Sequence, residues 1–314
     1  MKRLSIILAS LFLVAGCGGM KISKPILKMM LKQTNTVSAA PAYADTLKHS
    51  IGVAYVESGS PYQVFDIYYA DPSVRKDAVL IDIHGGFYVA GRRENNRGFA
   101  SVFLKEGYDV VLVEYRHSDG KLDVSHELED CAAALDYLTV NATKLGLNKD
   151  RMFLTGDSAG GHLALYMGEG TCDTSVPIRP TKFKTQGVLL SCPAYDFASF
   201  AQAKGLTKSA IKWFVGPRYE DKQWLLDVSP KTYIASYTGP LFVSTCTNDF
   251  IRSQSLLIKA DRDAKGLNLE FVDIESDDKK VAHVHNVINQ TLPESMRVNA
   301  KMVEFMDKCL EARK

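Results

Sequence analysis

Gly156-Asp157-Ser158-Ala159-Gly160-Gly161 is the stretch of sequence that decides the fold. An apolar run, 152–155, comes before it and a helical pattern, 159–167, follows it, so Ser158 is predicted to lie on a sharp strand-to-helix turn. Small residues fit on both sides of such a serine because a larger side chain would collide with neighbouring backbone. The helix N-terminus also brings backbone N–H groups close to the serine. We therefore predict that Ser158 is a nucleophile and that the Ala159 N–H stabilises an oxyanion.

A second glycine-rich segment, His84-Gly85-Gly86-Phe87, follows the apolar run 78–83. Glycine lets the backbone turn its N–H groups toward a substrate carbonyl, where they stabilise the negative charge of a tetrahedral intermediate. We predict that Gly85 and Gly86 donate to the oxyanion together with the residue after the serine. The N–H of Phe87 is the alternative donor.

Short apolar strands alternate with amphipathic helices along the rest of the chain, which predicts an α/β fold with a largely parallel sheet covered on both faces. Antiparallel pairing is expected only at the first hairpin. The interval 197–237 is longer than an ordinary connection and is predicted to be a lid, with Trp213, Phe214, Trp224 and Leu225 as its large apolar residues. The expected strands are 52–58, 64–69, 78–83, 110–115, 152–155, 187–191, 241–245 and 269–274, and the expected helices are 127–145, 159–167, 254–265 and 293–310.

The two glycine-rich motifs, with Tyr115-Arg116 between them, resemble the hormone-sensitive-lipase-like and related carboxylesterase branch of the α/β-hydrolases. The resemblance extends from about residue 78 to the C-terminus. It implies an eight-stranded, mostly parallel sheet flanked by helices, a lid insertion, and a triad in the order serine, acid, histidine. It also implies hydrolysis of carboxylic esters through an acyl-enzyme on Ser158, with no cofactor and no metal. Phe87 stands where the family has a third glycine, which predicts a narrowed acyl pocket and a preference for short-chain acyl esters.

The acid and the base are predicted from their positions in this fold. Asp249 follows the strand 241–245, where the fold places the acid, and Asp196 is the alternative. Only His283 and His285 come after the acid and the last strand. In an extended loop, residues two apart point to the same side, so spacing alone does not separate them. The family loop resembles His-x-Phe, which matches His283 to the catalytic position and leaves His285 as the alternative base.

The N-terminus is typical of an exported protein. A basic pair, 2–3, leads into the apolar run 4–15, which is too short to span a bilayer but long enough for a signal-peptide core. The sequence Leu-Val-Ala-Gly-Cys at 13–17 resembles the lipobox of bacterial lipoproteins. We expect residues 1–16 to be removed and Cys17 to carry the lipid that anchors the protein to the cell membrane.

Residues 17–50 are expected to form the lipid anchor, a basic amphipathic segment and a linker, followed by a catalytic domain at 51–314. Lysines recur at helical spacing between residues 20 and 32, with apolar residues at the other positions. This segment either lies on an anionic membrane surface or packs on the catalytic body. The sequence does not decide between the two.

Charge and cysteine content exclude several classes of function. The chain has 38 basic and 36 acidic residues, and loss of the basic pair with the signal peptide takes two from 38 and leaves 36 of each. This balance gives no electrostatic reason to expect binding to nucleic acid, so the expected partner is a small-molecule ester. The oligomeric state is not predicted. Beyond Cys17 the cysteines show no CxxC unit and no His/Cys metal pattern, which favours buried thiols over a disulfide framework or a zinc site; they are Cys131, Cys172, Cys192, Cys246 and Cys309.

Two other functions remain compatible with the motifs. One is a serine peptidase of the same fold, which is disfavoured because the sequence shows no extra domain of propeller size. The other is a catalytically inactive α/β-hydrolase-like binding protein, which is disfavoured because all three triad residues are present. Two further polar residues receive structural roles: Arg116 is expected to pair with Asp130, and Asp157 is expected to hydrogen-bond nearby backbone.

Overall fold

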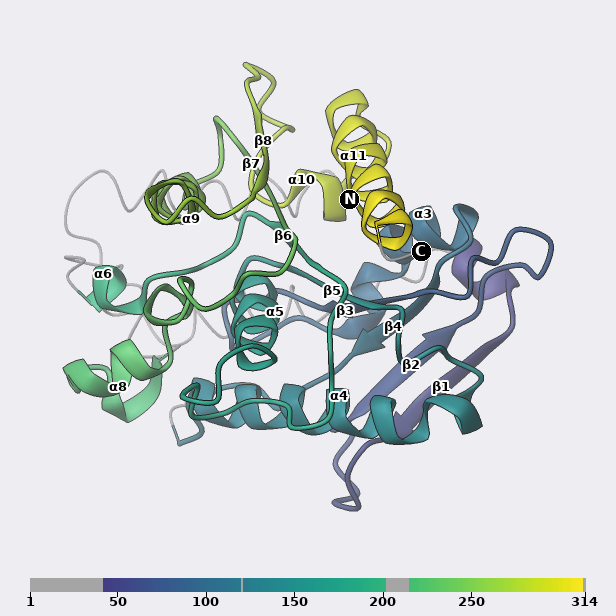
Figure 1. Cartoon of the computed structure of the whole chain (residues 1–314), viewed down its shortest axis with the longest axis horizontal. Coiled ribbons are helices and arrows are strands. Elements are labelled where there is room, and N and C mark those ends of the chain that lie inside the picture. The colour runs from purple at the N-terminus through teal and green to yellow at the C-terminus, as the bar shows by residue number, and fades with distance from the viewer. Residues whose placement is uncertain (1–41, 120, 202–214, 313–314) are drawn as a thin grey trace, which may run out of the picture.

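Eight strands form one twisted sheet at the centre of the computed structural model, which describes residues 42–119, 121–201 and 215–312 (Figure 1). The strand order is β1-β2-β4-β3-β5-β6-β7-β8. All eight predicted strands are present, so the predicted fold class is confirmed. The strands are β1 (His49–Ala54), β2 (Val64–Tyr68), β3 (Val79–Ile83), β4 (Asp109–Val113), β5 (Met152–Asp157), β6 (Val188–Ser191), β7 (Leu241–Cys246) and β8 (Glu270–Ile274).

The sheet is parallel from β4 through β3 to β8. The hairpin strands β1 and β2 are antiparallel, as expected. The expectation that antiparallel pairing stops there is wrong, because β2 also pairs antiparallel with β4, with Phe65 opposite Val113. The reason is geometric: β1 covers only one edge of β2, and the other edge forms its hydrogen bonds with the first strand of the parallel part.

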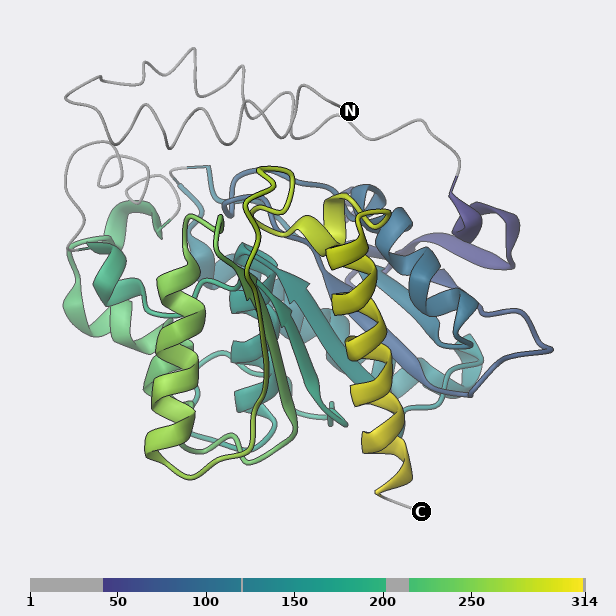
Figure 2. The same cartoon turned by 90° about the horizontal axis from the view of Figure 1, so that it is seen from above.

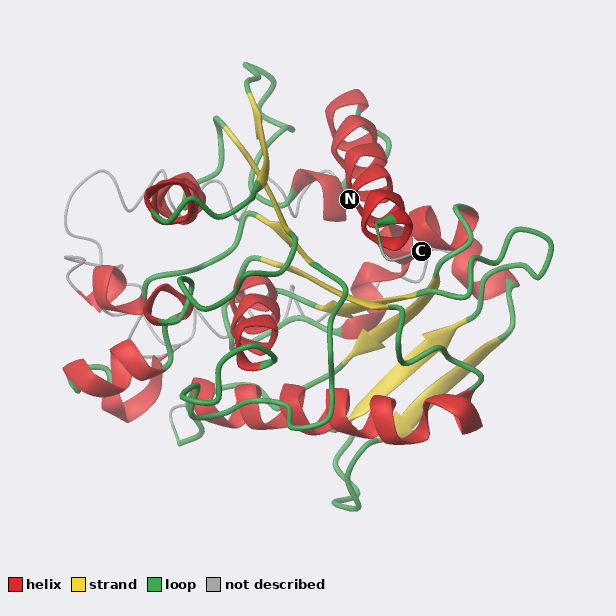
Figure 3. Cartoon of the chain, viewed as in Figure 1, coloured by secondary structure: helices red, strands yellow, loops and turns green. Residues whose placement is uncertain are grey.

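Helices cover both faces of the sheet (Figures 1 and 3). Side chains of a strand alternate between faces, so Val79 and Ile81 join the core under α4, α5 and α9, whereas Leu80 joins the core under α3 and α11. Because both faces are covered, every residue of β3 is buried. The larger helices are α3 (Arg97–Lys105), α4 (Val124–Leu145), α5 (Ala159–Gly170), α9 (Arg252–Ala264) and α11 (Pro293–Glu311), with the short α10 (His285–Ile288) beside α11.

The folded body begins earlier than the boundary expected at residue 51. The 3-10 helix η1 (Tyr43–Thr46) precedes β1, and Ala44 within it is fully buried. Its N–H donates to Ser101 Oγ on α3 at 3.1 Å. Residues 43–50 are therefore part of the catalytic body and not of a linker.

The predicted lid interval contains four short helical segments among its described residues (Figure 2). Trp224 and Leu225 are each only 3% exposed, so within this interval they are core residues. Trp213 and Phe214 lie outside the described residues, as do Cys17, the predicted signal peptide and the basic segment at 20–32. Among the helices that the structure describes, none is both long enough and apolar enough to cross a bilayer. The segments are α6 (Phe197–Ala201), η3 (Gly216–Arg218), α8 (Lys222–Asp227) and η4 (Pro230–Thr232).

Candidate active site

Ser158 lies between the end of β5 and the first residue of α5, on the turn that the sequence predicts. Its backbone has a positive φ, with φ 54° and ψ −116°, a conformation that a non-glycine residue adopts only where its surroundings enforce it. The flanking glycines are required by close contacts. A Cβ on Gly156 would lie 2.3 Å from the carbonyl oxygen of Gly160, and a Cβ on Gly160 would lie 1.9 Å from that of Ile83. The turn therefore holds the serine hydroxyl above the carboxyl ends of the parallel strands.

The structure brings Ser158, His283 and Asp249 together in one chain of hydrogen bonds. His283 Nε2 lies 2.9 Å from Ser158 Oγ, and His283 Nδ1 lies 2.7 Å from Asp249 Oδ1. Asp249 is fixed in turn: its Oδ1 also accepts the Ile251 N–H at 3.0 Å, and its Oδ2 accepts the Thr245 hydroxyl at 2.9 Å. Burial opposes ionisation of Asp249, but the charge of His283 and these donors outweigh it and hold the pKa of the carboxyl below its usual value.

The two alternative residues lie elsewhere. His285 does not point to the same side as His283, because Val284 between them is left-handed, with φ 52° and ψ 30°. His285 is buried with Nδ1 2.8 Å from Ser295 Oγ, and burial lowers its pKa to about 4. Asp196 accepts the Ser199 N–H at 3.1 Å and contacts neither histidine in any described hydrogen bond or ion pair.

One predicted oxyanion donor needs correction. The Gly85 N–H donates to Asp157 Oδ1 at 3.1 Å and is therefore not available to an oxyanion. The same contact confirms the expected hydrogen bond between Asp157 and nearby backbone. The segment still passes directly over the serine, since a Cβ on Gly85 would lie 3.1 Å from Ser158 Cβ. Ala159 is the first residue of α5, where a backbone N–H has no partner within the helix. The remaining candidate donors are the N–H groups of Gly86 and Ala159, with that of Phe87 as the alternative.

Two stacked phenylalanine rings form an aromatic wall beside His283, and only Phe87 was identified from the sequence. The ring of Phe87 stacks on that of Phe250 with centroids 5.9 Å apart, and the ring of Phe250 lies 4.2 Å from that of His283. Both phenylalanines are half-buried. The available signal for Phe250 was its position directly after Asp249. The predicted pair of Arg116 and Asp130 is confirmed as a two-pronged bond of 2.8 and 2.7 Å.

Two clusters of described residues offer donor atoms that a metal ion could use. The first joins Cys192 to Asp249 and His283. Burial raises the pKa of the Cys192 thiol well above its usual value, and the Val284 N–H donates to the sulfur at 3.3 Å, so this thiol is a poor ligand. The second cluster is that of His84, Glu114 and His117. No disulfide joins any of the five cysteines that the structure describes.

This sheet order, with a serine on the turn after β5, an aspartate after β7 and a histidine after β8, is that of an α/β-hydrolase. The BD-FAE family model matches residues 65–259, and the chain belongs to the BD-FAE family.

Similar proteins include several that are named as ester hydrolases. The chain is 28% identical over 183 residues to the probable carboxylic ester hydrolase LipM of Mycobacterium tuberculosis, a match that covers 54% of this chain and 41% of LipM. It is 27% identical over 220 residues to carboxylesterase NlhH of the same organism, covering 65% of this chain and 66% of NlhH. The matches thus span less than two thirds of these relatives. Esterase B from Lactobacillus rhamnosis has a similar structure, with a TM-score of 0.78, 24% identity, and coverage of 100% of this chain and 98% of that one.

Proposed function

We propose that this protein is a serine hydrolase that cleaves carboxylic esters of small molecules through an acyl-enzyme on Ser158. The hydrogen-bonded chain from Ser158 through His283 to Asp249 carries the proposal, because it supplies a nucleophile, a base and a group that orients the base. The similar proteins LipM and NlhH are named as a probable carboxylic ester hydrolase and a carboxylesterase, which supports the same class of reaction.

In the proposed mechanism, His283 Nε2 takes the proton of the Ser158 hydroxyl as its oxygen attacks the ester carbonyl. Asp249 accepts a hydrogen bond from Nδ1, which selects the tautomer with a free lone pair on Nε2 and stabilises the imidazolium that forms. The imidazolium then gives its proton to the leaving alcohol. Water attacks the resulting acyl-enzyme with His283 as base, which releases the acid and restores the serine.

The tetrahedral intermediate places a negative charge beside the glycine segment and the start of α5. The N–H groups of Gly86 and Ala159 would donate to this oxygen. Each such donor contributes on the order of 3 kcal/mol to the transition state in serine hydrolases. The Gly85 N–H supports the loop through Asp157 and does not take part directly.

We further propose a preference for short acyl chains. Phe87 and Phe250 occupy space next to His283, and their rings support each other. Forcing a methylene into filled space costs about 1–3 kcal/mol, whereas burying one favourably contributes about 0.8 kcal/mol, so steric exclusion should dominate beyond short chains. Structurally similar esterase B has been solved with a tributyrin phosphonate, an analogue of a short-chain ester.

The experiment that tests the proposal is a rate profile over p-nitrophenyl esters of increasing acyl length, with Ser158→Ala as the matched variant. We expect kcat/KM to peak between acetyl and butyryl esters and to fall for octanoyl and longer ones. Ser158→Ala should abolish hydrolysis while the fold survives. Cleavage of peptide substrates without ester hydrolysis would favour the peptidase, and absence of both activities would favour an inactive binding protein.

We also propose that Cys17 carries a lipid that anchors the enzyme to the cell membrane after export. The support is the sequence at 13–17 and the apolar run before it. Cys17→Ser in a bacterial host should release the enzyme from the membrane fraction or stall its processing. Unchanged detergent partitioning with normal cleavage of the signal would contradict the anchor without affecting the proposed reaction.

A further inference from the structure

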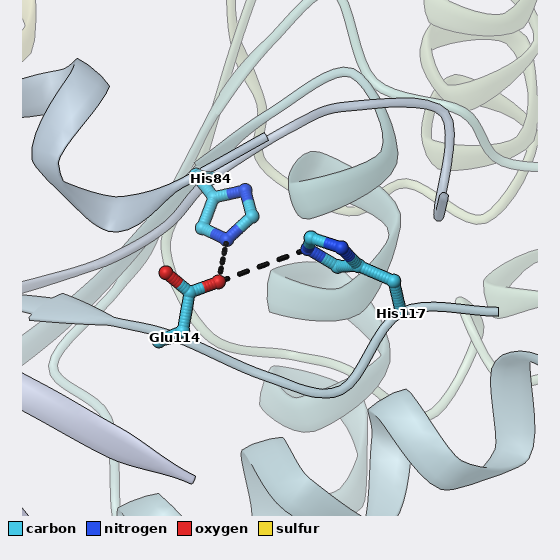
Figure 4. Close-up of side chains that lie close together, drawn as sticks. All are labelled: His84, Glu114 and His117. Carbon is cyan, nitrogen blue, oxygen red and sulfur yellow. Dashed lines mark hydrogen bonds and ion pairs between the residues drawn. The ribbon is translucent and has the colours of Figure 1, made fainter. Parts of the chain in front are cut away.

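A buried histidine, His84, contacts the oxyanion loop, which we define as residues 85–87. The proposed mechanism gives this histidine no role. His84 follows β3 and is 1% exposed, and Glu114 beside it, at the end of β4, is fully buried (Figure 4). His84 Nε2 lies 3.1 Å from Glu114 Oε1. On the opposite side of the ring, Nδ1 lies 2.7 Å from the carbonyl oxygen of Gly85.

These contacts define the protonation state of His84. A carbonyl oxygen accepts hydrogen bonds and cannot donate them, so Nδ1 must carry a proton. Nε2 faces a carboxylate, which also accepts when it is ionised. Both ring nitrogens then act as donors, and His84 is an imidazolium. Burial disfavours this charge, but Glu114 outweighs burial and raises the pKa of His84 above its usual value.

Two arginines hold the other carboxylate oxygen of Glu114. Oε2 accepts from Arg92 Nε at 3.0 Å, from the Arg93 N–H at 3.2 Å and from the Arg93 guanidinium at 3.4 Å. Although burial opposes ionisation, the positive charge of His84 and its hydrogen bond, with the backbone N–H of Arg93 contributing, lower the pKa of Glu114 to about 2. One carboxylate thus joins the oxyanion loop to the segment at 92–93.

His117 completes a set of ligands that would suit zinc, but the surrounding charge argues against a metal ion. Its Nε2 lies 3.7 Å from Glu114 Oε1, beside the His84 contact (Figure 4). A divalent cation there would face the guanidinium groups of Arg92 and Arg93 across one carboxylate. Burial and the charge of His84 lower the pKa of His117 to about 4, so His117 is neutral and a single charged imidazole faces Glu114.

The bond to Gly85 fixes the direction of the next N–H group. In a trans peptide, the C=O of Gly85 and the N–H of Gly86 lie in one plane and point in opposite directions. Asp157 holds the N–H of Gly85 and His84 holds its C=O, so this residue is fixed from both sides. Among the described residues, no acceptor is bonded to the Gly86 N–H, which leaves it available to a ligand.

We propose that His84 is a positioning residue whose imidazolium, anchored on Glu114, clamps the Gly85–Gly86 peptide and aims the Gly86 N–H at the oxyanion. This inference rests on the proposed ester hydrolysis at Ser158. Gly91 covers the clamp, since a Cβ there would lie 2.2 Å from the Gly85 oxygen and 2.6 Å from His84 Nδ1. The backbone of Gly91 therefore shields the bond from water, which strengthens it.

The other groups that face His84 also fit a fixed positive charge. From the loop after β4, the ring of Tyr115 stacks on His84 with centroids 4.4 Å apart, and its hydroxyl donates to the His84 carbonyl at 2.6 Å. From β5, the carboxyl of Asp157 also raises the pKa of His84. From β3, burial raises the pKa of Asp82 to about 7, and the charge of His84 only partly opposes this shift. Glu114 and Asp157 therefore both favour the charged ring.

Two substitutions of His84 separate the clamp from a purely structural role. The side-chain amide of His84→Asn can take the place of Nδ1 and still donate to the Gly85 carbonyl, but it does not reach Glu114. The longer side chain of His84→Gln reaches Glu114 and loses the bond to Gly85. We expect His84→Gln to lower kcat on p-nitrophenyl butyrate by a factor on the order of 10²–10³, the loss of one oxyanion donor, with KM changed only a few-fold. His84→Asn should keep kcat within about tenfold of wild type.

A transition-state analogue provides the second readout. An alkyl trifluoromethyl ketone forms an oxyanion on the serine, so its affinity should fall in parallel with kcat/KM in His84→Gln and much less in His84→Asn. Ile81→Val is a conservative core change on β3, the strand that precedes His84, and serves as the control for general disturbance of that strand. It should change neither kcat/KM nor the affinity for the ketone. Equal losses in the two His84 variants, or a larger loss in His84→Asn, would overturn the clamp while wild-type activity keeps the proposed function intact. An inactive wild-type enzyme would overturn both.

The protonation state can be measured without any variant. In wild-type protein labelled with ¹⁵N-histidine, one ring should keep protons on both nitrogens into mildly alkaline solution, with its Nδ1 proton protected from exchange. If no histidine is doubly protonated at neutral pH, the imidazolium clamp is wrong, whether or not the substituted chains fold.

Discussion

Replacement of Asp249 by asparagine tests the charge in the triad separately from its geometry. Asp249 Oδ1 accepts from both His283 and the Ile251 N–H, so the amide oxygen of the introduced asparagine must take this position. Its amino group then faces the Thr245 hydroxyl, which can turn from donor to acceptor. The variant thus keeps the correct tautomer of the histidine and loses only the counter-charge of the imidazolium.

The magnitude follows from Coulomb's law. Unit charges about 4 Å apart attract by about 4 kcal/mol at an effective dielectric constant near 20. His283 is 12% exposed, and this partial access of water reduces the attraction. We therefore expect Asp249→Asn to lower kcat by a factor on the order of 10²–10³, below the loss of about 10⁴ that a wrong tautomer causes in a serine protease.

The assay is the rate of p-nitrophenyl butyrate hydrolysis by wild type, Asp249→Asn and the matched control Asp196→Asn. Asp196 lies directly before α6, where its Oδ1 accepts the Ser199 N–H, and should be replaceable with almost no effect on kcat. The reasoning fails if Asp249→Asn lowers kcat less than about tenfold, or if Asp196→Asn lowers it equally.

Four further substitutions test other parts of the account. His283→Ala should lose kcat by at least about 10⁴-fold, whereas His285→Ala should keep most activity and lose about 2 kcal/mol of unfolding free energy with its buried contact to Ser295; the reverse order in a rate and urea-unfolding comparison would move the base to His285. Phe87→Gly should shift the optimum of the acyl-length profile upward, and an unchanged profile would show that this ring does not limit the pocket. Burial and the charge of Asp157 raise the pKa of Asp82 to about 7, so its contribution to stability is full below about pH 4 and is lost as pH rises through 7. Asp82→Asn should therefore lose less unfolding free energy than wild type between pH 4 and pH 8, and parallel pH profiles would contradict the raised pKa.

Features that depend on residues close together in the sequence were predictable. The turn at Ser158 is predicted by the two flanking glycines and by the change from a strand-like to a helix-like hydrophobic period. The position of Asp249 as the acid is predicted because it comes just after a strand. The strands were predicted with errors of a few residues at their ends because their apolar runs are short and bounded by turns.

Features that depend on tertiary contacts were not predictable. The choice between His283 and His285 as the base was open because two residues that are two apart in an extended loop point to the same side. The left-handed backbone of Val284 instead turns the two rings in different directions. Gly85 has the sequence context of an oxyanion donor, but its N–H is bonded to Asp157, a residue 72 positions away in the sequence. The wall of Phe87 and Phe250 joins segments more than a hundred residues apart and carries no local pattern.

The central claim is that Ser158 is the activated nucleophile of an ester hydrolase, and covalent labelling tests it most directly. Purified full-length enzyme is treated with a fluorophosphonate and digested, and the modified peptide is located by mass spectrometry, with Ser158→Ala treated in parallel. We predict a single adduct on Ser158, formed in step with loss of hydrolysis of p-nitrophenyl butyrate, and no adduct in the variant. An adduct on another residue, or an active enzyme that the reagent leaves unmodified and uninhibited, would contradict the account.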